Sequence, residues 1–85
     1  MASYRLLIKP SAAKELERTP LDIRRRIVIR MEKLSGDPRP SGSQKLGARD
    51  IYRVRQGDYR ILYEVNDRTR TVTVFKIGHR SEVYR

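Results

Sequence analysis

The sequence predicts an α+β fold, a small antiparallel-type sheet in the order β-α-α-β-β-β with two N-terminal helices packed on one face. Three observations support this prediction. An apolar segment opens the chain, two segments with helical spacing follow it, and three segments with alternating apolar and polar residues fill the second half. With 85 residues, the chain is expected to form a single domain spanning 1–85.

The first 18 residues indicate a strand followed by a short helix. Residues 4–9 have the apolar centre that is typical of a strand. Pro10 ends this strand, and Ser11 is the expected N-cap of a helix that runs to about Arg18. Its buried side is expected to consist of Ala12, Ala13 and Leu16.

A second helix is indicated by its start signal and by its apolar stripe. Thr19 is the expected N-cap, Pro20 suits the first helical position, and Asp22 stands where a capping box has its acid. The helix is expected to run to about Ser35, with Gly36 as its C-terminal residue. Its apolar stripe consists of Ile23, Ile27, Met31 and Leu34.

Three further strands are expected over residues 51–55, 59–65 and 71–77. Residues 56–58 form a tight connection and residues 66–70 a looser one. Short connections join antiparallel neighbours, so these strands are predicted to form an antiparallel meander. Alternation assigns one apolar face to the helices, consisting of Tyr52, Val54, Ile61, Tyr63 and Val65.

Arginines occupy the opposite, open face of the predicted sheet, where Arg53, Arg55 and Arg60 lie close enough to surround one phosphate. An ordinary solvated sheet face is the alternative interpretation. Such a face would mix charge signs, because like charges opposite each other destabilise a sheet. Glu64 is the one acid that alternation assigns to this face. The pattern therefore favours a binding site for phosphates or carboxylates.

The net charge of +10, with a pI near 10.7, is the strongest global property. Most of the basic residues are arginine, whose planar guanidinium matches phosphate geometry. The composition therefore favours a nucleic-acid partner. A basic surface kept for solubility or for an acidic protein partner is the alternative, and the two interpretations are compatible.

Several classes of site are excluded by composition. The chain has no cysteine and one histidine, so a disulfide framework, a thiolate zinc site and a multi-histidine metal site are ruled out. No metal is expected, because metal-dependent nucleases need clustered acids that this chain lacks, and no cofactor is expected either. There is no signal-peptide pattern and no long apolar run, so we expect a soluble, cytoplasmic protein with no membrane partner.

The C-terminal residues 78–85 bring further candidate groups to the edge of the sheet, namely His79, Arg80 and Tyr84. Each has an ordinary alternative, since a lone histidine is more often a surface or capping residue and Tyr84 can anchor the terminus by packing. RNA offers metal-free chemistry, in which the 2′-hydroxyl attacks the adjacent phosphate with help from a base, an acid and positive charge. Neighbouring arginines would favour a tyrosine phenolate as that base.

At these residues the sequence resembles the RelE branch of the RelE/ParE superfamily, the toxins of type II toxin–antitoxin pairs. The resemblance covers nearly the whole chain, and its specific parts are residues 57–64 and 78–85. It implies the RelE fold, a small sheet backed by two N-terminal helices. It also implies a ribosome-dependent endoribonuclease, an mRNA interferase that inhibits translation by cutting mRNA in the ribosomal A site. The implied partners are a cognate antitoxin, the ribosome and mRNA.

The resemblance also implies a role for each candidate residue. Arg60 matches the arginine that holds the scissile phosphate, and Arg80 the arginine assigned to transition-state charge or to protonating the leaving group. Tyr84 matches the proposed base. Arg53 and Arg55 match positions that contact the substrate backbone and are commonly lysine, and Lys45 is placed with them as a phosphate contact. Arginine's very high pKa makes proton donation by these two residues less favourable, so His79 is a further candidate acid.

Two other functions stay open on the sequence alone. A ParE-like toxin has the same fold and inhibits DNA gyrase without cutting RNA, and a degenerate member would be a non-catalytic nucleic-acid-binding module. The presence of Arg60, Arg80 and Tyr84 favours the ribonuclease, because gyrase inhibition does not need this set.

Overall fold

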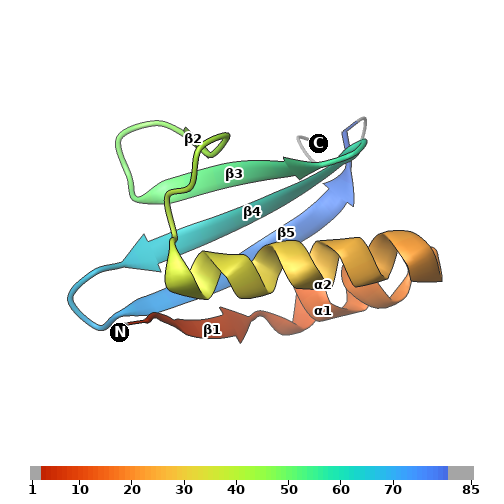
Figure 1. The fold of residues 1–85 in the computed structure, drawn as a ribbon, viewed down its shortest axis with the longest axis horizontal. Helices are drawn as coiled ribbons and strands as arrows, with labels where there is room; N and C mark the ends of the chain where they lie inside the picture. The colour runs from red at the N-terminus through yellow and green to blue at the C-terminus, as the bar shows by residue number, and fades with distance from the viewer. Residues whose placement is uncertain (1–2, 81–85) are drawn as a thin grey trace.

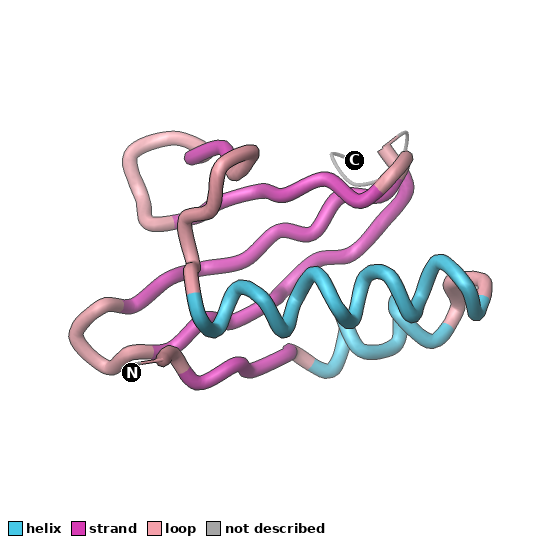
Figure 2. Tube along the Cα trace, viewed as in Figure 1, coloured by secondary structure: helices cyan, strands magenta, loops and turns pink. Residues whose placement is uncertain are grey.

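The computed structural model describes residues 3–80, in which two helices follow the first strand along the chain and lie over one face of the sheet (Figure 1). The colouring of Figure 2 separates the helices from the strands behind them. In chain order the elements are β1 (Arg5–Ile8), α1 (Pro10–Glu17), α2 (Leu21–Gly36), β2 (Gln44–Lys45), β3 (Ile51–Gln56), β4 (Tyr59–Asn66) and β5 (Thr71–His79).

The strands form one five-stranded sheet in the order β1-β5-β4-β3-β2. Neighbours are antiparallel from β2 to β5, which confirms the predicted meander of β3, β4 and β5. The α+β fold class is therefore confirmed, with two differences in the sheet. β2 is an additional strand of two residues, and β1 is parallel to β5, so the sheet is mixed.

The parallel pairing of β1 and β5 follows from the helices that separate β1 from the other strands. Arg5 pairs with Thr71 and Ile8 with Val74, so the first strand meets the last. Parallel neighbours need a crossover connection, and α1 and α2 lie within it. This crossover places both helices over one face of the sheet (Figure 1).

The hydrophobic core lies between the helices and that sheet face. The predicted stripe of α2 is confirmed, because Ile27, Met31 and Leu34 are buried and Ile23 packs against the same cluster. On the sheet, all five predicted inward residues are buried: Tyr52, Val54, Ile61, Tyr63 and Val65. Residues with these large apolar side chains are the main source of stability in a small domain.

The predicted helix caps are wrong. Lys9 stands at the N-cap of α1 and Pro20 at that of α2, and neither makes a side-chain capping hydrogen bond. Ser11 lies inside α1. Thr19 is 4% exposed, and its hydroxyl donates to the carbonyl oxygen of Glu15 at 3.0 Å, so it closes α1 instead of opening α2. The predicted end of α2 at Gly36 is correct.

β5 is longer than the sequence predicts. Gly78 pairs with Arg60 and His79 with Tyr59, so both residues belong to the strand and Gly78 does not turn the chain away. The hydrogen-bonded pairing of β4 with β5 therefore continues to the end of the sheet where β3 and β4 are joined. One irregularity interrupts it, where the register shifts between Leu62 and Tyr63.

Glu15 covers the part of β5 that β1 leaves unpaired. β1 pairs with β5 only as far as Val74. Beyond that point, the backbone N–H of Ile77 donates to Oε1 of Glu15 at 2.9 Å, and Nζ of Lys76 lies 2.9 Å from Oε2. One side chain of α1 thus satisfies an edge donor and joins the helix to the strand.

For the part of the chain that the structure describes, neither helix combines the length and the apolar character needed to cross a membrane.

Candidate active site

The β3–β4 hairpin positions the candidate site, and its turn consists of Gly57 and Asp58. Gly57 has φ +61°, a left-handed conformation that glycine adopts without strain. Glycine with positive φ at the first central position is typical of a type II′ turn, whose twist matches that of the strands it joins. The turn closes on the pair Gln56 and Tyr59, which sets the register of every pair behind it.

Directly behind this closing pair, Arg55 of β3 stands opposite Arg60 of β4. Paired residues share a face, so the two guanidinium groups emerge on the same side of the hairpin. Arg53 lies two residues along β3 on that face, opposite Leu62. Gly78 of β5 pairs with Arg60 from the other side and contributes no side chain beside it. The structure therefore brings Arg53, Arg55 and Arg60 together on one face of two strands.

Hydrogen bonds hold two of these arginines. Nη1 of Arg60 donates to the carbonyl oxygens of Gly57 at 3.3 Å and Tyr59 at 3.2 Å, so the guanidinium lies against the turn. Nη2 of Arg53 donates to Oε1 of Gln44 on β2. Arg55 is exposed. Because like charges face each other at Arg55 and Arg60, the pair is destabilising by itself and favours a bound anion.

A backbone hydrogen bond holds Arg80 at the same end of the sheet. Its N–H donates to the carbonyl oxygen of Asp58 at 2.8 Å, which ties the chain after β5 to the β3–β4 turn. Figure 1 shows this turn and the end of β5 at one end of the molecule. The side chain of Arg80 is exposed. Tyr84, the candidate base, lies outside the described residues.

His79 and Lys45 lie on the other face of the sheet. His79 pairs with Tyr59, which belongs to the inward alternation of β4, and their rings meet edge to face with centroids 5.6 Å apart. His79 and Tyr59 line a hollow of about 400 Å³ beside α1, together with Glu15 and Lys76. Lys45 pairs with Tyr52 and is exposed on the short strand β2. Neither side chain shares the face of Arg55 and Arg60.

The chain matches, over residues 6–84, the family described as the ParE toxin of type II toxin–antitoxin system, parDE. It belongs to this toxin family. Membership confirms the predicted place of the chain in the RelE/ParE superfamily, and the match extends through the hairpin and the tail that carry the candidate residues.

Solved structures of RelE toxins superpose on nearly all of this toxin. RelE in the archaeal RelE–RelB complex from Pyrococcus horikoshii OT3 is 29% identical, with a TM-score of 0.80 over 98% of this chain and 100% of that chain. A mutant of E. coli toxin RelE in the free state is 27% identical, with a TM-score of 0.82 over 96% of this chain and 90% of that chain. The fold is thus the RelE fold.

A curated relative, Toxin RelG of Mycobacterium tuberculosis, is 38% identical over 34 residues. These residues are 40% of this chain and 39% of RelG, so the match spans about two-fifths of that relative's length.

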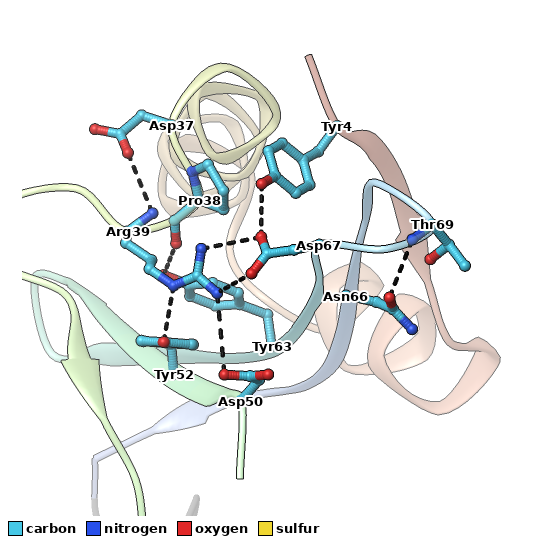
Figure 3. A network of polar contacts seen from close by, with 10 residues as sticks. All are labelled: Tyr4, Asp37, Pro38, Arg39, Asp50, Tyr52, Tyr63, Asn66, Asp67 and Thr69. Atoms are coloured by element: carbon cyan, nitrogen blue, oxygen red, sulfur yellow. Dashed lines mark hydrogen bonds and ion pairs between the residues drawn. The ribbon is translucent and has the colours of Figure 1, made fainter. Parts of the chain in front are cut away.

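At the opposite end of the sheet, the toxin has a polar network that the sequence analysis did not predict (Figure 3). Its centre is Arg39, in the loop after α2. Arg39 donates from Nε to the hydroxyl of Tyr52 at 2.8 Å, and from Nη1 and Nη2 to the carboxylate of Asp67 at 3.1 and 2.9 Å. Nη2 also lies 3.9 Å from Asp50. The hydroxyl of Tyr4 donates to Asp67 at 2.6 Å. The network therefore joins the N-terminal segment, the loop and the β4–β5 turn.

The pKa values in this network follow from its hydrogen bonds. The bond from Arg39, and then that from Tyr4, lowers the pKa of Asp67. The same carboxylate raises the pKa of Tyr4 and of Arg39. Tyr63 lies beneath, fully buried, and donates to the carbonyl oxygen of Pro38 at 2.7 Å, and burial raises its pKa to about 12. The sequence signal for the network is Arg39 between two prolines, which restrict the backbone on both sides of it.

Proposed function

We propose that this toxin is a ribosome-dependent endoribonuclease that acts in the cytoplasm and cuts mRNA in the ribosomal A site. In this proposal residues 1–85 act as one domain, without metal or cofactor. The observation that supports it most directly is the pairing of Arg55 with Arg60, beside Arg53 and next to the backbone anchor of Arg80. A cluster of guanidinium groups on one sheet face suits the crowded phosphate of RNA during strand cleavage.

The reaction needs one proton removed and one proton delivered. Tyr84 takes the proton of the 2′-hydroxyl, whose oxygen attacks the adjacent phosphorus. The bond from phosphorus to the 5′-oxygen breaks as that oxygen receives a proton, which leaves a 2′,3′-cyclic phosphate and a 5′-hydroxyl. Arg60 holds the phosphate and Arg80 stabilises the added charge, while Arg53 and Arg55 bind the neighbouring backbone. Lys45, exposed on the edge strand β2, contacts a phosphate farther along the RNA strand.

The proton donor in this proposal is Arg80 or His79. Histidine side chains often serve as general acids in enzymes, but the pairing of His79 with Tyr59 directs it to the face of the helices. Arg80 stands on the turn that also carries Arg60. A variant with His79→Gln separates the two. A proton donor must be protonated to act, so a donor role predicts the loss of the alkaline limb of the pH–rate profile for cleavage, whereas a structural role leaves the shape of the profile unchanged.

The proposed partner in the cell is an acidic or amphipathic antitoxin. RelE has been solved in complex with RelB from Pyrococcus horikoshii and in the intact RelBE complex of E. coli. A mutant E. coli RelE has also been solved with a peptide of the antitoxin RelB. By analogy, we infer that a RelB-like segment covers the arginines of this toxin and blocks its access to RNA.

Primer extension on a reporter mRNA after brief induction tests the proposed activity. Cuts confined to translated regions and in register with the reading frame are expected. Arg60→Ala and Arg80→Ala should each reduce cleavage by about 10²–10³, the effect of losing one preorganised charge-stabilising group. Arg68→Ala is the matched control, since it removes an exposed arginine from the opposite end of the sheet. Undiminished cleavage in both site variants would remove these residues from the mechanism.

Inhibition of DNA gyrase is the second candidate function, favoured by the ParE family to which the chain belongs. Inhibited supercoiling with intact mRNA in expressing cells would establish it in place of the ribonuclease. A non-catalytic nucleic-acid-binding module is the third candidate. Growth inhibition that survives Tyr84→Phe, with unchanged mRNA decay, would point to that module.

A further inference from the structure

A second group of basic side chains lies where α2 passes the end of β3. The residues that carry them line a hollow of about 240 Å³. Its lining residues are Arg26, Ile29, Arg30 and Lys33 from α2, and Arg55 and Gln56 from β3. Positions 26, 30 and 33 follow the spacing that puts side chains on one stripe of a helix. We call the four basic residues of this hollow, Arg26, Arg30, Lys33 and Arg55, the α2 cluster.

The positive charge of the α2 cluster is not compensated by the protein. No residue that lines the hollow is acidic. Within residues 3–80, no ion pair joins a member of the cluster to a carboxylate. Four cations around one hollow repel each other, and a bound anion would relieve that repulsion.

Arg30 provides an independent observation. Its Nε is buried, and among the described residues it has no hydrogen-bond partner. Buried N–H groups in folded proteins are nearly always paired, so an unpaired one indicates a missing acceptor. The Arg30 guanidinium therefore has hydrogen-bonding capacity that the described residues do not use.

Arg55 links the α2 cluster to the candidate active site. It lines the hollow, and it also stands opposite Arg60 in the hairpin. We propose that the α2 cluster is a second phosphate-binding site, which holds the RNA backbone next to the phosphate bound at Arg60. The inference rests on the proposed function, because it extends the path of the strand assigned there. A planar guanidinium fork suits this backbone better than a point charge does.

The salt dependence of RNA binding tests the inference. The probe is a short single-stranded 2′-O-methyl RNA, which has the phosphates of RNA but no 2′-hydroxyl to attack them. Each phosphate contact contributes about −0.7 to the slope of log K against log salt for single strands. Arg26→Gln/Lys33→Gln should make this slope less steep by about 1.4 and weaken binding equally for all sequences. Both residues are exposed, so the fold is expected to persist, and circular dichroism checks it.

Arg25→Gln/Arg68→Gln is the matched control, because it removes the same charge from two exposed positions outside the hollow. Its slope should stay close to that of the wild type. An unchanged slope in Arg26→Gln/Lys33→Gln, or an equal change in the control, would overturn the proposal and leave only a diffuse positive field.

An acidic polypeptide is the competing occupant, and Ile29 distinguishes it. Ile29 is 53% exposed at the hollow and offers an apolar contact that a peptide would use and a phosphate backbone would not. Ile29→Gln should therefore leave RNA affinity unchanged. If the Arg26→Gln/Lys33→Gln variant keeps its RNA slope but loses binding to a polyglutamate peptide, the hollow belongs to an acidic protein partner and the proposal is wrong.

Failure of this inference is separable from failure of the proposed function, because the probe cannot be cleaved. A toxin that binds RNA with the expected change in slope but makes no cuts in mRNA would overturn the nuclease and support the second phosphate site. A toxin that cuts mRNA, but whose RNA binding has the same salt dependence in the wild type and in Arg26→Gln/Lys33→Gln, would support the nuclease and overturn the second phosphate site.

Discussion

Asp67 is the residue on which the polar network depends, because Arg39 and Tyr4 both donate to its carboxylate. These hydrogen bonds lower its pKa in the folded protein. A carboxyl group whose folded pKa lies below its unfolded value stabilises the fold at higher pH, where it is ionised in both states. That stabilisation is lost as the pH falls through the folded pKa.

Asp67→Asn should therefore lower the urea midpoint at neutral pH, and the difference from wild type should shrink as the pH falls below about 4. Urea unfolding followed by circular dichroism at several pH values measures this change. Glu32→Gln is the control, since it removes one exposed carboxylate from α2. A midpoint difference that is the same at neutral and acid pH would show that the substitution acts through packing and not through charge.

Among individual residues, the sequence could predict those whose position depends on local alternation. Arg55 and Arg60 flank a tight turn, and period-two alternation alone places them on one face. His79 could not be placed in this way, because its face depends on two further strand residues that pair with β4. Arg39 and Asp67 were not predicted, since their contact joins loops 28 residues apart.

At the scale of elements, α1 depends on Glu15 for its attachment to β5. The carboxylate accepts from the N–H of Ile77 and pairs with Lys76. Glu15→Gln keeps an oxygen that can accept from Ile77, whereas Glu15→Ala leaves this edge donor without that partner.

We expect Glu15→Ala to destabilise the fold by about 1–3 kcal/mol, and Glu15→Gln by less, because an unsatisfied donor costs more than a partly exposed ion pair contributes. Urea unfolding measures both changes, and hydrogen exchange at the amide of Ile77 should accelerate only in the alanine variant. Glu17→Ala is the control, an exposed glutamate two residues along α1. Equal losses in the alanine and glutamine variants would assign the stabilisation to Lys76 instead.

Elements were predictable where their signal is periodic. The stripe of α2 and the alternation of β3, β4 and β5 repeat over enough residues to show both type and face. β2 has two residues, too few to show any period. The partner of β1 is β5, more than 60 residues away along the chain, and alternation identifies a strand but not its distant neighbour.

At the scale of the whole molecule, the net positive charge is large for a protein of these dimensions. A net charge of +10 is distributed over a molecule whose extents are 33 × 26 × 25 Å. Such an excess destabilises the compact state through self-repulsion. The ion pairs of residues 3–80 oppose this repulsion at few places, where Arg39 contacts Asp50 and Asp67 and Lys76 contacts Glu15. Repulsion is therefore expected to exceed attraction in the total electrostatic energy.

Added salt should then stabilise this protein, because screening weakens the repulsion more than it weakens the few exposed ion pairs. The urea midpoint is expected to rise as sodium chloride increases to about 0.15 M, where the screening length is about 8 Å. At equal ionic strength sulfate should raise it further, because a divalent anion can bind between paired arginines. Arg25→Gln/Arg68→Gln, which lowers the formal net charge from +10 to +8, should show a smaller rise with chloride. A midpoint that falls with salt would mean that the ion pairs dominate and that the arginine clusters are not strained in the free protein.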